Sequence, residues 1–278
     1  MSRCQLRFLH TGDLQLHRPP AGVPELPDDL KQVLLDSRIA AAQNVFDAAL
    51  ANAVDFVVLS GNVIDVEQAA PSALRFLVEQ FERLNERNIA VYWAGGPRDV
   101  PGRWPAGLPL PENVHHFHAD KVESHSYLRD GETHAVITGA SNTRERFRPA
   151  DYRPGREGVF TIAVACGEAS QDEMTARGIP YWALGGRDAA ETITSEPHVI
   201  RYCGAPQGSS QTDCGKHGAT LVSVDDAGEV RLQAIACDVI RFQNEQLSAT
   251  STTSDEELFQ LLVERTGQLI TGAPDRHL

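Results

Sequence analysis

The sequence lacks several features that mark whole classes of protein. No run approaches the roughly 18 consecutive apolar residues that a membrane-spanning helix needs, and the opening MSRCQLRFLH has no long apolar core of a secretory signal. The five cysteines form an odd set without a C-x-x-C pair, which argues against a disulfide framework and a cysteine zinc site. These absences predict a cytoplasmic chain with reduced, mostly buried thiols and no membrane contact.

Positive charge is also scarce. The 25 Lys and Arg residues face 38 Asp and Glu, so the formal net charge is −13 over 278 residues. Such a chain repels polyanions unless its basic residues gather on one face, so nucleic acid and anionic membranes are disfavoured partners. A hydrophobic content of 41% and a charged content of 23% exclude disordered and fibrous classes. The length predicts one or two domains.

The first part of the chain alternates strand and helix patterns. Strands are expected at 5–10, 55–60 and 89–94, the last two as buried parallel strands. Apolar residues at helical spacing predict helices over 30–53 and 71–87. This order predicts a layered α/β domain with right-handed crossovers and a site in the loops that follow its strands.

The pattern then changes to strands with few helices, which a second sheet packed on the first would bury. These strands are expected at 114–118, 134–138, 160–165, 181–184, 199–202, 219–224 and 229–236. A polar linker follows at 248–254, and an amphipathic helix at 255–270. The sequence then stops without a convincing last element, so we expect a fragment or a vestigial C-terminal region.

Short motifs containing Gly and Asp follow successive strands. They are FLHTGDLQL (8–16), DFVVLSGNVID (55–65), VYWAGGPRD (91–99), TIAVACG (161–167) and YWALGGRD (181–188). Their order and spacing resemble the calcineurin-like metallophosphoesterases, and more narrowly the nuclease subunit of the bacterial SbcCD complex and its double-strand-break repair relatives. The strand-rich segment 199–228 is similar to the region after the last metal motif of that subfamily, and the resemblance runs from about residue 5 to 245.

The resemblance implies an α/β fold, a four-layer α-β-β-α sandwich with two packed mixed sheets. It implies a metallophosphoesterase-like domain at 1–247 and, at 248–278, a linker with the start of a C-terminal helical or capping region. Relatives grip an ATPase of the SbcC type through the region after the phosphoesterase domain, and the segment 255–270 falls where such a region would begin. Packing of that helix onto its own domain is an equal alternative, and a homodimer is left open.

The family motifs, D-x-H, G-D-x-x-D, G-N-H-D, a lone H and G-H-x-H, hold two divalent metals about 3.5–4 Å apart, and a metal-bound hydroxide attacks the phosphodiester. The positions that match their ligands and catalytic residue here are Asp13, Gln15, Asn62, Pro97, Arg98, Cys166, Gly186 and Asp188. Only Asp13 keeps the family identity, and Arg98, followed by Asp99, stands where the catalytic His should be. The motif flanks survive, so a shifted register does not explain these losses.

Each loss weakens a metal site. Asn62 puts a neutral amide where a carboxylate would bridge two dications, and the side chains of Pro97 and Gly186 carry no ligand atom. Arg98 adds a permanent cation and cannot act as a general acid near neutral pH. We therefore expect no cofactor and no intact catalytic residue. The alternative is a single weakly bound divalent metal, Mn or Zn.

We expect the charge of Arg98 to replace that of the metals. An unpaired buried cation is costly, so the guanidinium should pair with Asp13 or Asp188, with Asp99 and Asp65 behind them.

Other candidate residues favour structural roles. His116 and His118, on one predicted strand face, are expected to be strand-surface residues without a third ligand. The resemblance implies that His17 is a loop residue, and reach of His17 into the vacated site is the alternative. Acids interspersed among the arginines of the stretch 144–156 predict a solvated, internally paired loop rather than a phosphate site. The remaining candidates are serines with no defensible triad: Ser60, Ser209 and Ser210.

Three functions follow. The first is a DNA-repair-exonuclease-like, metallophosphoesterase-fold protein that is catalytically inactive and acts by binding a partner. The second is an active metal-dependent phosphodiesterase or DNA exonuclease with a reorganised site. The third is nucleic-acid or nucleotide binding without cleavage through Arg98 and the loop arginines, against which the net charge of −13 weighs.

Overall fold

The computed structural model describes residues 4–18, 20–21, 28–250 and 253–272 and contains two six-stranded mixed sheets. The first sheet has the order β12-β11-β1-β2-β3-β4. Its strands are β1 (Cys4–Thr11), β2 (Phe56–Ser60), β3 (Ala90–Ala94), β4 (Val114–His116), β11 (Gly218–Asp225) and β12 (Val230–Ala236). Strands β1 to β4 are parallel, whereas β11 and β12 run antiparallel at one edge. The parallel core matches the predicted βαβαβ unit.

The second sheet has the order β5-β6-β7-β8-β10-β9. Its strands are β5 (Glu123–Arg129), β6 (Glu132–Gly139), β7 (Phe160–Cys166), β8 (Tyr181–Gly185), β9 (Glu191–Thr194) and β10 (Val199–Tyr202). The four central strands are parallel, and β5 and β9 pair antiparallel at the two edges. The sequence patterns missed both edge strands.

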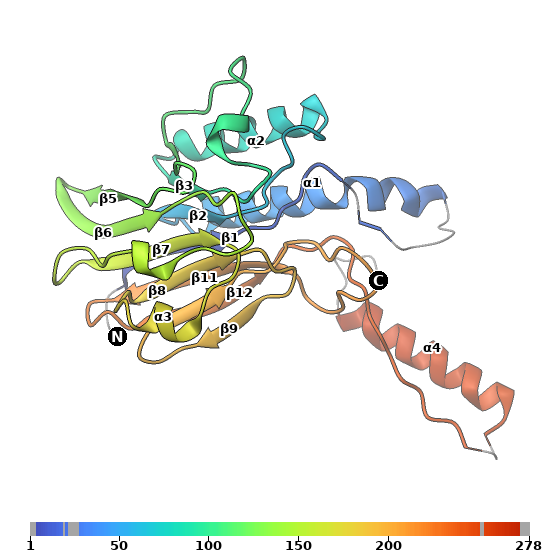
Figure 1. Ribbon diagram of the computed structural model, residues 1–278. Coiled ribbons are helices and arrows are strands. Elements are labelled where there is room, and N and C mark those ends of the chain that lie inside the picture. Colours follow the sequence, from blue (N-terminus) through green and yellow to red (C-terminus); the bar gives the residue numbers. More distant parts are fainter. Residues whose placement is uncertain (1–3, 19, 22–27, 251–252, 273–278) are drawn as a thin grey trace.

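Helices cover the outer face of the first sheet. Helix α1 (Asp28–Ala51) and helix α2 (Pro71–Asn85) lie on the same side of β1, β2 and β3 (Figure 1). Phe46 of α1 and Phe81 of α2 are fully buried and meet edge to face at 6.0 Å between ring centroids. The apolar stripes predicted for these two helices therefore form one core with the sheet beneath them.

Two further apolar layers complete the sandwich. Between the sheets, Phe8 and Phe56 of the first sheet pack against Tyr181 and other residues of the second. On the outer face of the second sheet lie helix α3 (Gln171–Thr175) and the 3-10 turn η2 (Pro149–Asp151), over a core around Trp182. The expected four-layer α-β-β-α arrangement is confirmed, with a fourth layer reduced to these short helical turns.

The C-terminal helix α4 (Asp255–Gly272) projects away from the sandwich (Figure 1). Among its described residues none is buried, and Phe259 remains 61% exposed. Glu245, in the segment that leads to the helix, accepts a hydrogen bond of 2.7 Å from Arg265 Nε. The helix is thus held to its own approach segment by an ion pair. Within the described residues, no helix is long and apolar enough to cross a membrane.

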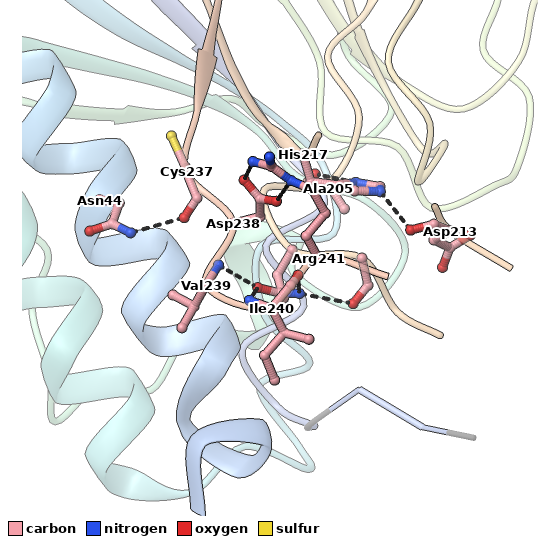
Figure 2. A network of polar contacts seen from close by, with 11 residues as sticks. Asn44, Ala205, Asp213, His217, Cys237, Asp238, Val239, Ile240 and Arg241 are labelled. Carbon is pink, nitrogen blue, oxygen red and sulfur yellow. Dashed lines mark hydrogen bonds and ion pairs between the residues drawn. The ribbon is translucent and has the colours of Figure 1, made fainter. Parts of the chain in front are cut away.

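A polar network holds the chain after β12 to the body (Figure 2). Asp238 and Arg241 are buried and joined by two hydrogen bonds, of 2.7 and 2.9 Å. Gln207 Oε1 accepts from the backbone amides of Val239 and Ile240, at 2.9 and 3.1 Å. Because Gln207 belongs to the loop after β10, this loop and the C-terminal segment are fixed to each other.

Candidate functional site

The loops after β1, β2, β3, β6, β7 and β8 surround one hollow of about 600 Å³. Six of the positions singled out in the motifs line it: Gln15, Asn62, Pro97, Arg98, Cys166 and Gly186. Asp13 lies beneath this surface, only 1% exposed, and Asp188 is joined to Gln15 by a hydrogen bond of 2.8 Å between its Oδ1 and Gln15 Nε2. The fold therefore brings the predicted site residues together at the carboxyl ends of parallel strands.

Tight turns place these side chains. The backbone of Asp13, Gln15 and Asn62 is left-handed, with φ of 51°, 48° and 47°. Hydrogen bonds tie the two turns together, because the Asp13 amide donates to Gly61 O at 2.9 Å and the Gln15 amide to Asn62 O at 3.0 Å. Position 61 requires glycine, because a Cβ at this residue would stand only 2.1 Å from Cys166 Sγ.

The Asp13 carboxylate is enclosed by N–H donors. Oδ1 accepts from Asn62 Nδ2 at 2.9 Å, and Oδ2 accepts from the Gly186 amide at 2.7 Å. Burial raises the pKa of Asp13 to about 7, against the opposing effect of these two donors. Each carboxylate oxygen is already engaged by a hydrogen-bond donor.

Asp99 has a structural setting of the same kind. It is fully buried, and its two oxygens accept from the amides of Gly96 at 2.6 Å and Val63 at 2.7 Å. Burial raises the pKa of this carboxyl to about 7. Asp99 thereby joins the loops after β2 and β3, which carry Asn62 and Arg98.

Arg98 forms an ion pair with Asp65, one of the four carboxylates expected for it, but not with the two favoured ones, Asp13 and Asp188. Its Nε lies 3.7 Å from Asp65 Oδ2, and its side chain is 54% exposed. The expected pairing with Asp13 or Asp188 is wrong, because those carboxylates are engaged by neutral amide and hydroxyl donors. The Arg98 side chain was also expected to be buried, whereas its guanidinium group lies at the rim of the hollow, in contact with solvent.

Cys166, in the position of the family's lone His, presents a neutral thiol. The residue is 3% exposed, and burial raises the pKa of its thiol well above the usual value. Cys166 and Cys203 are buried and free, whereas Cys214 is free and exposed. Within the described part of the chain, no three His, Cys, Asp or Glu side chains are grouped so as to hold a metal ion.

The structure adds basic residues that the sequence patterns did not assign to this site. His17 and Arg18 line the hollow, with Arg18 Nη2 donating to Gln15 Oε1 at 2.9 Å. His17 Nδ1 accepts from the Asp65 amide at 3.2 Å. Burial lowers the pKa of His17, and the charges of Arg18, Arg98 and Arg38 act in the same direction, opposed by Asp65.

Arg144 and Arg146 are exposed, as predicted for a solvated loop, and they also line the hollow, which the sequence did not lead us to expect. Among the arginines and acids of that loop, the ion pair found in the described residues joins Arg148 to Asp151 at 3.9 Å. The signal available in the sequence was the clustering of arginines between two motif strands.

Two other candidates occupy different places from those expected. His116 is not a surface residue, because it stacks on Trp93 at 4.0 Å between ring centroids and its Nε2 lies 2.9 Å from Asp99 O. His118 lies beyond the end of β4 and pairs with Glu123 at 2.7 Å. The two histidines therefore do not share a strand face.

Ser60 contacts a histidine that the sequence did not link to it. His10 Nε2 lies 3.0 Å from Ser60 Oγ, and His10 Nδ1 lies 3.0 Å from Tyr181 Oη. Ser60 and His10 are fully buried, and burial lowers the pKa of His10 to about 3. A serine sealed in the core cannot meet a substrate, so this contact packs the strand ends.

Comparisons with known proteins give two curated relatives. No family model matches the sequence. The chain is 28% identical over 280 residues to "Uncharacterized metallophosphoesterase YhaO" of Bacillus subtilis strain 168, covering 95% of this chain and 68% of that protein. It is 26% identical over 230 residues to "DNA double-strand break repair protein Mre11" of Thermoplasma acidophilum, covering 73% and 60%. The chain thus spans only part of each relative.

Among solved structures, a chain in "GAP50 the anchor in the inner membrane complex of Plasmodium" aligns over 94% of this chain and 95% of its own length. The TM-score is 0.49 and the sequence identity 14%.

Proposed function

The chain belongs to the calcineurin-like metallophosphoesterase superfamily, with a DNA double-strand break repair protein among its relatives, and we propose that it is a catalytically inactive member of that superfamily. We propose that it acts by binding a partner. The observation that carries the proposed loss of catalysis is the enclosure of Asp13. Its two oxygens accept from Asn62 Nδ2 and the Gly186 amide, at 2.9 and 2.7 Å. Both oxygens of the motif carboxylate that this sequence keeps are thus engaged by N–H donors of the positions that would supply metal ligands in the family.

The other residues at this site do not fit two divalent metals either. Hard dications such as Mg²⁺ or Mn²⁺ bind anionic or carbonyl oxygens, and Zn²⁺ takes imidazole or thiolate. Asn62 turns its NH₂ group toward Asp13, and the Cys166 thiol is held neutral by burial. Arg98 adds positive charge at the rim. These features support loss of the two-metal centre.

Gly186 supports the same proposal through its backbone. It occupies a family histidine position, yet its φ is 99°, a conformation in which an L side chain is strained. A Cβ at this residue would stand 3.1 Å from the Gly167 amide nitrogen. The backbone at this position therefore disfavours a histidine ligand.

The partner that we propose is an ATPase of the SbcC type, engaged through α4. The support is the apolar surface of this helix, because Phe259, Leu262 and Ile270 are 61%, 48% and 56% exposed. Exposed apolar side chains clustered on one projecting helix are typical of partner-binding surfaces.

Elemental analysis and a phosphodiesterase assay test the loss of catalysis. We expect less than one Mn, Zn or Fe per purified chain, and no hydrolysis of bis-p-nitrophenyl phosphate or of DNA ends with added manganese. Two metals per chain, or metal-dependent turnover that disappears in Asp13→Ala, would overturn the proposal. That outcome would establish the alternative, an active metal-dependent phosphodiesterase or exonuclease with a reorganised site.

Titration of the purified chain with the SbcC-type ATPase of the same organism tests the partner. We expect Phe259→Ser and Leu262→Ser to weaken the complex. Leu128→Ser is the matched control, because Leu128 is 57% exposed on β5. Absence of a complex, or equal weakening by all three variants, would refute the role of α4.

A further inference from the structure

Four arginines surround the hollow, in a chain whose net charge is −13. They come from the loops after β1 and β3 and from the loop between β6 and β7. They are Arg18, Arg98, Arg144 and Arg146. The fold thus concentrates positive charge from separate segments around one cavity, against the sign of the whole molecule.

Three acidic side chains also line the hollow and offset part of this charge. Asp65 lies beside Arg98, whereas Glu168 is 3.5 Å from Arg187, a residue outside the lining. Glu145 is the third lining acid. Within the described residues, Arg98 is the lining arginine found in an ion pair, while Arg18 donates to the neutral amide of Gln15.

A fifth arginine stands behind the wall of the hollow. Arg38 of α1 is 4% exposed, and its Nη2 donates to Ser209 Oγ at 3.0 Å. Its Nε and Nη1 are buried without a hydrogen-bond partner in the part of the chain that the structure describes. Together with Arg18 and Arg98, it acts electrostatically on His17, which lines the hollow. Several guanidinium charges therefore converge on one side of the cavity.

We propose that this hollow binds the phosphate group of a small phosphorylated molecule directly through its arginines, without a metal ion. Guanidinium groups bind phosphate oxygens in paired, charge-assisted hydrogen bonds. A volume of about 600 Å³ suits a ligand on the scale of a mononucleotide. Long polyanions are disfavoured by the net charge of −13. This inference rests on the proposed loss of the two-metal centre.

Isothermal titration of the full chain in EDTA tests the proposal with three probes: inorganic phosphate, AMP and a 5′-phosphorylated 20-nucleotide single strand. We expect saturable binding of phosphate and AMP. The strand should bind no more tightly than its terminal phosphate group alone would account for. Arg98→Gln and Arg146→Gln should each weaken AMP binding by roughly tenfold or more, the usual effect of losing a hydrogen bond to a charged group. Arg148→Gln, on the same loop but outside the lining, should bind as the parent does.

Three other results would contradict the proposal or the loss of the metal centre on which it rests. No binding of phosphate or AMP in EDTA, or equal binding by the parent and both lining variants, would refute the arginine site. Binding of the strand alone would refute the small-molecule ligand. Uptake of two Mn²⁺ per chain with hydrolysis would instead refute the loss of the metal centre, so the two failures are distinguishable. Far-ultraviolet circular dichroism of each variant separates loss of binding from loss of fold.

Discussion

Burial of His10 should make the protein less stable in acid. The ring is fully buried between Ser60 Oγ and Tyr181 Oη, each at 3.0 Å, and cannot be hydrated. Burial is the main cause that lowers the pKa of His10 to about 3, with a smaller effect of the Arg201 charge. A histidine in an unfolded chain has a pKa of about 6.5. Below that pH the unfolded chain therefore takes up a proton that the folded chain does not.

The sign and size follow from this difference. Protons favour the unfolded state as the pH falls through about 6.5, and the loss continues down to the folded pKa of about 3. At pH 5, which is about 1.5 pH units below 6.5, His10 should lower the free energy of unfolding by about 2 kcal/mol relative to pH 8. Asp13 and Asp99 oppose this effect, because their raised pKa values favour the folded state as the pH falls below about 7.

The assay must therefore isolate the histidine. We would measure urea unfolding at pH 8 and pH 5 for the parent and for His10→Gln, and compare the two changes with pH rather than the stabilities themselves. The variant should lose about 2 kcal/mol less than the parent between these pH values. His118→Gln is the control, because this imidazole side chain is 73% exposed. An equal change with pH in the parent and His10→Gln would refute the argument from burial.

Three further perturbations test other parts of the fold. Asp99→Ala should lower the free energy of unfolding by about 3 kcal/mol in urea unfolding, because the buried amides of Gly96 and Val63 lose their acceptor, whereas the same change at the exposed Glu112 should be neutral. Gly185→Ala should lower the thermal midpoint or prevent folding, because the added Cβ would stand 1.4 Å from Ser60 O. Gly102→Ala is the control, because a Cβ at Gly102 would meet open space. An unchanged midpoint in Gly185→Ala would show that the strand ends are not packed this closely. Phe259→Ser should leave the midpoint of the isolated chain unchanged, because no described residue of α4 is buried, and a clear decrease would indicate that α4 packs on the domain.

Much of the fold follows from local patterns in the sequence. Helix α1, expected at 30–53, spans Asp28–Ala51, and β2 lies within the run expected at 55–60. These elements have one dominant signal, an apolar stripe or a continuous apolar run. Strand β5 was missed because its sequence, ESHSYLR, places polar residues on both its half-buried face and its exposed face, so it lacks an apolar alternation. Helix α3 has only five residues, too few for a helical period.

The candidate site was predictable in part of its membership but not in its contacts. The motif spacing located six residues that line the hollow, because parallel strands end on one edge of each sheet, whereas it did not locate Arg18, Arg144 and Arg146 there. The partner of Arg98 was not predictable, because it depends on which carboxylates other donors already engage. The enclosure of Asp13 depends on left-handed backbone at Asn62, which a sequence pattern does not encode.

The loop that follows β10 connects the two parts of the molecule to which we assign binding. At one end the Ala205 amide donates to Asp188 O at 2.9 Å, and Ser209 Oγ donates to Asp188 Oδ2 at 3.3 Å, next to the hollow. At the other end, Gln207 accepts hydrogen bonds from the amides of Val239 and Ile240, in the chain that leads to α4. One loop therefore makes the hydrogen bonds that fix the chain leading to α4, those that position Asp188 and, through Ser209, the one to the buried guanidinium of Arg38.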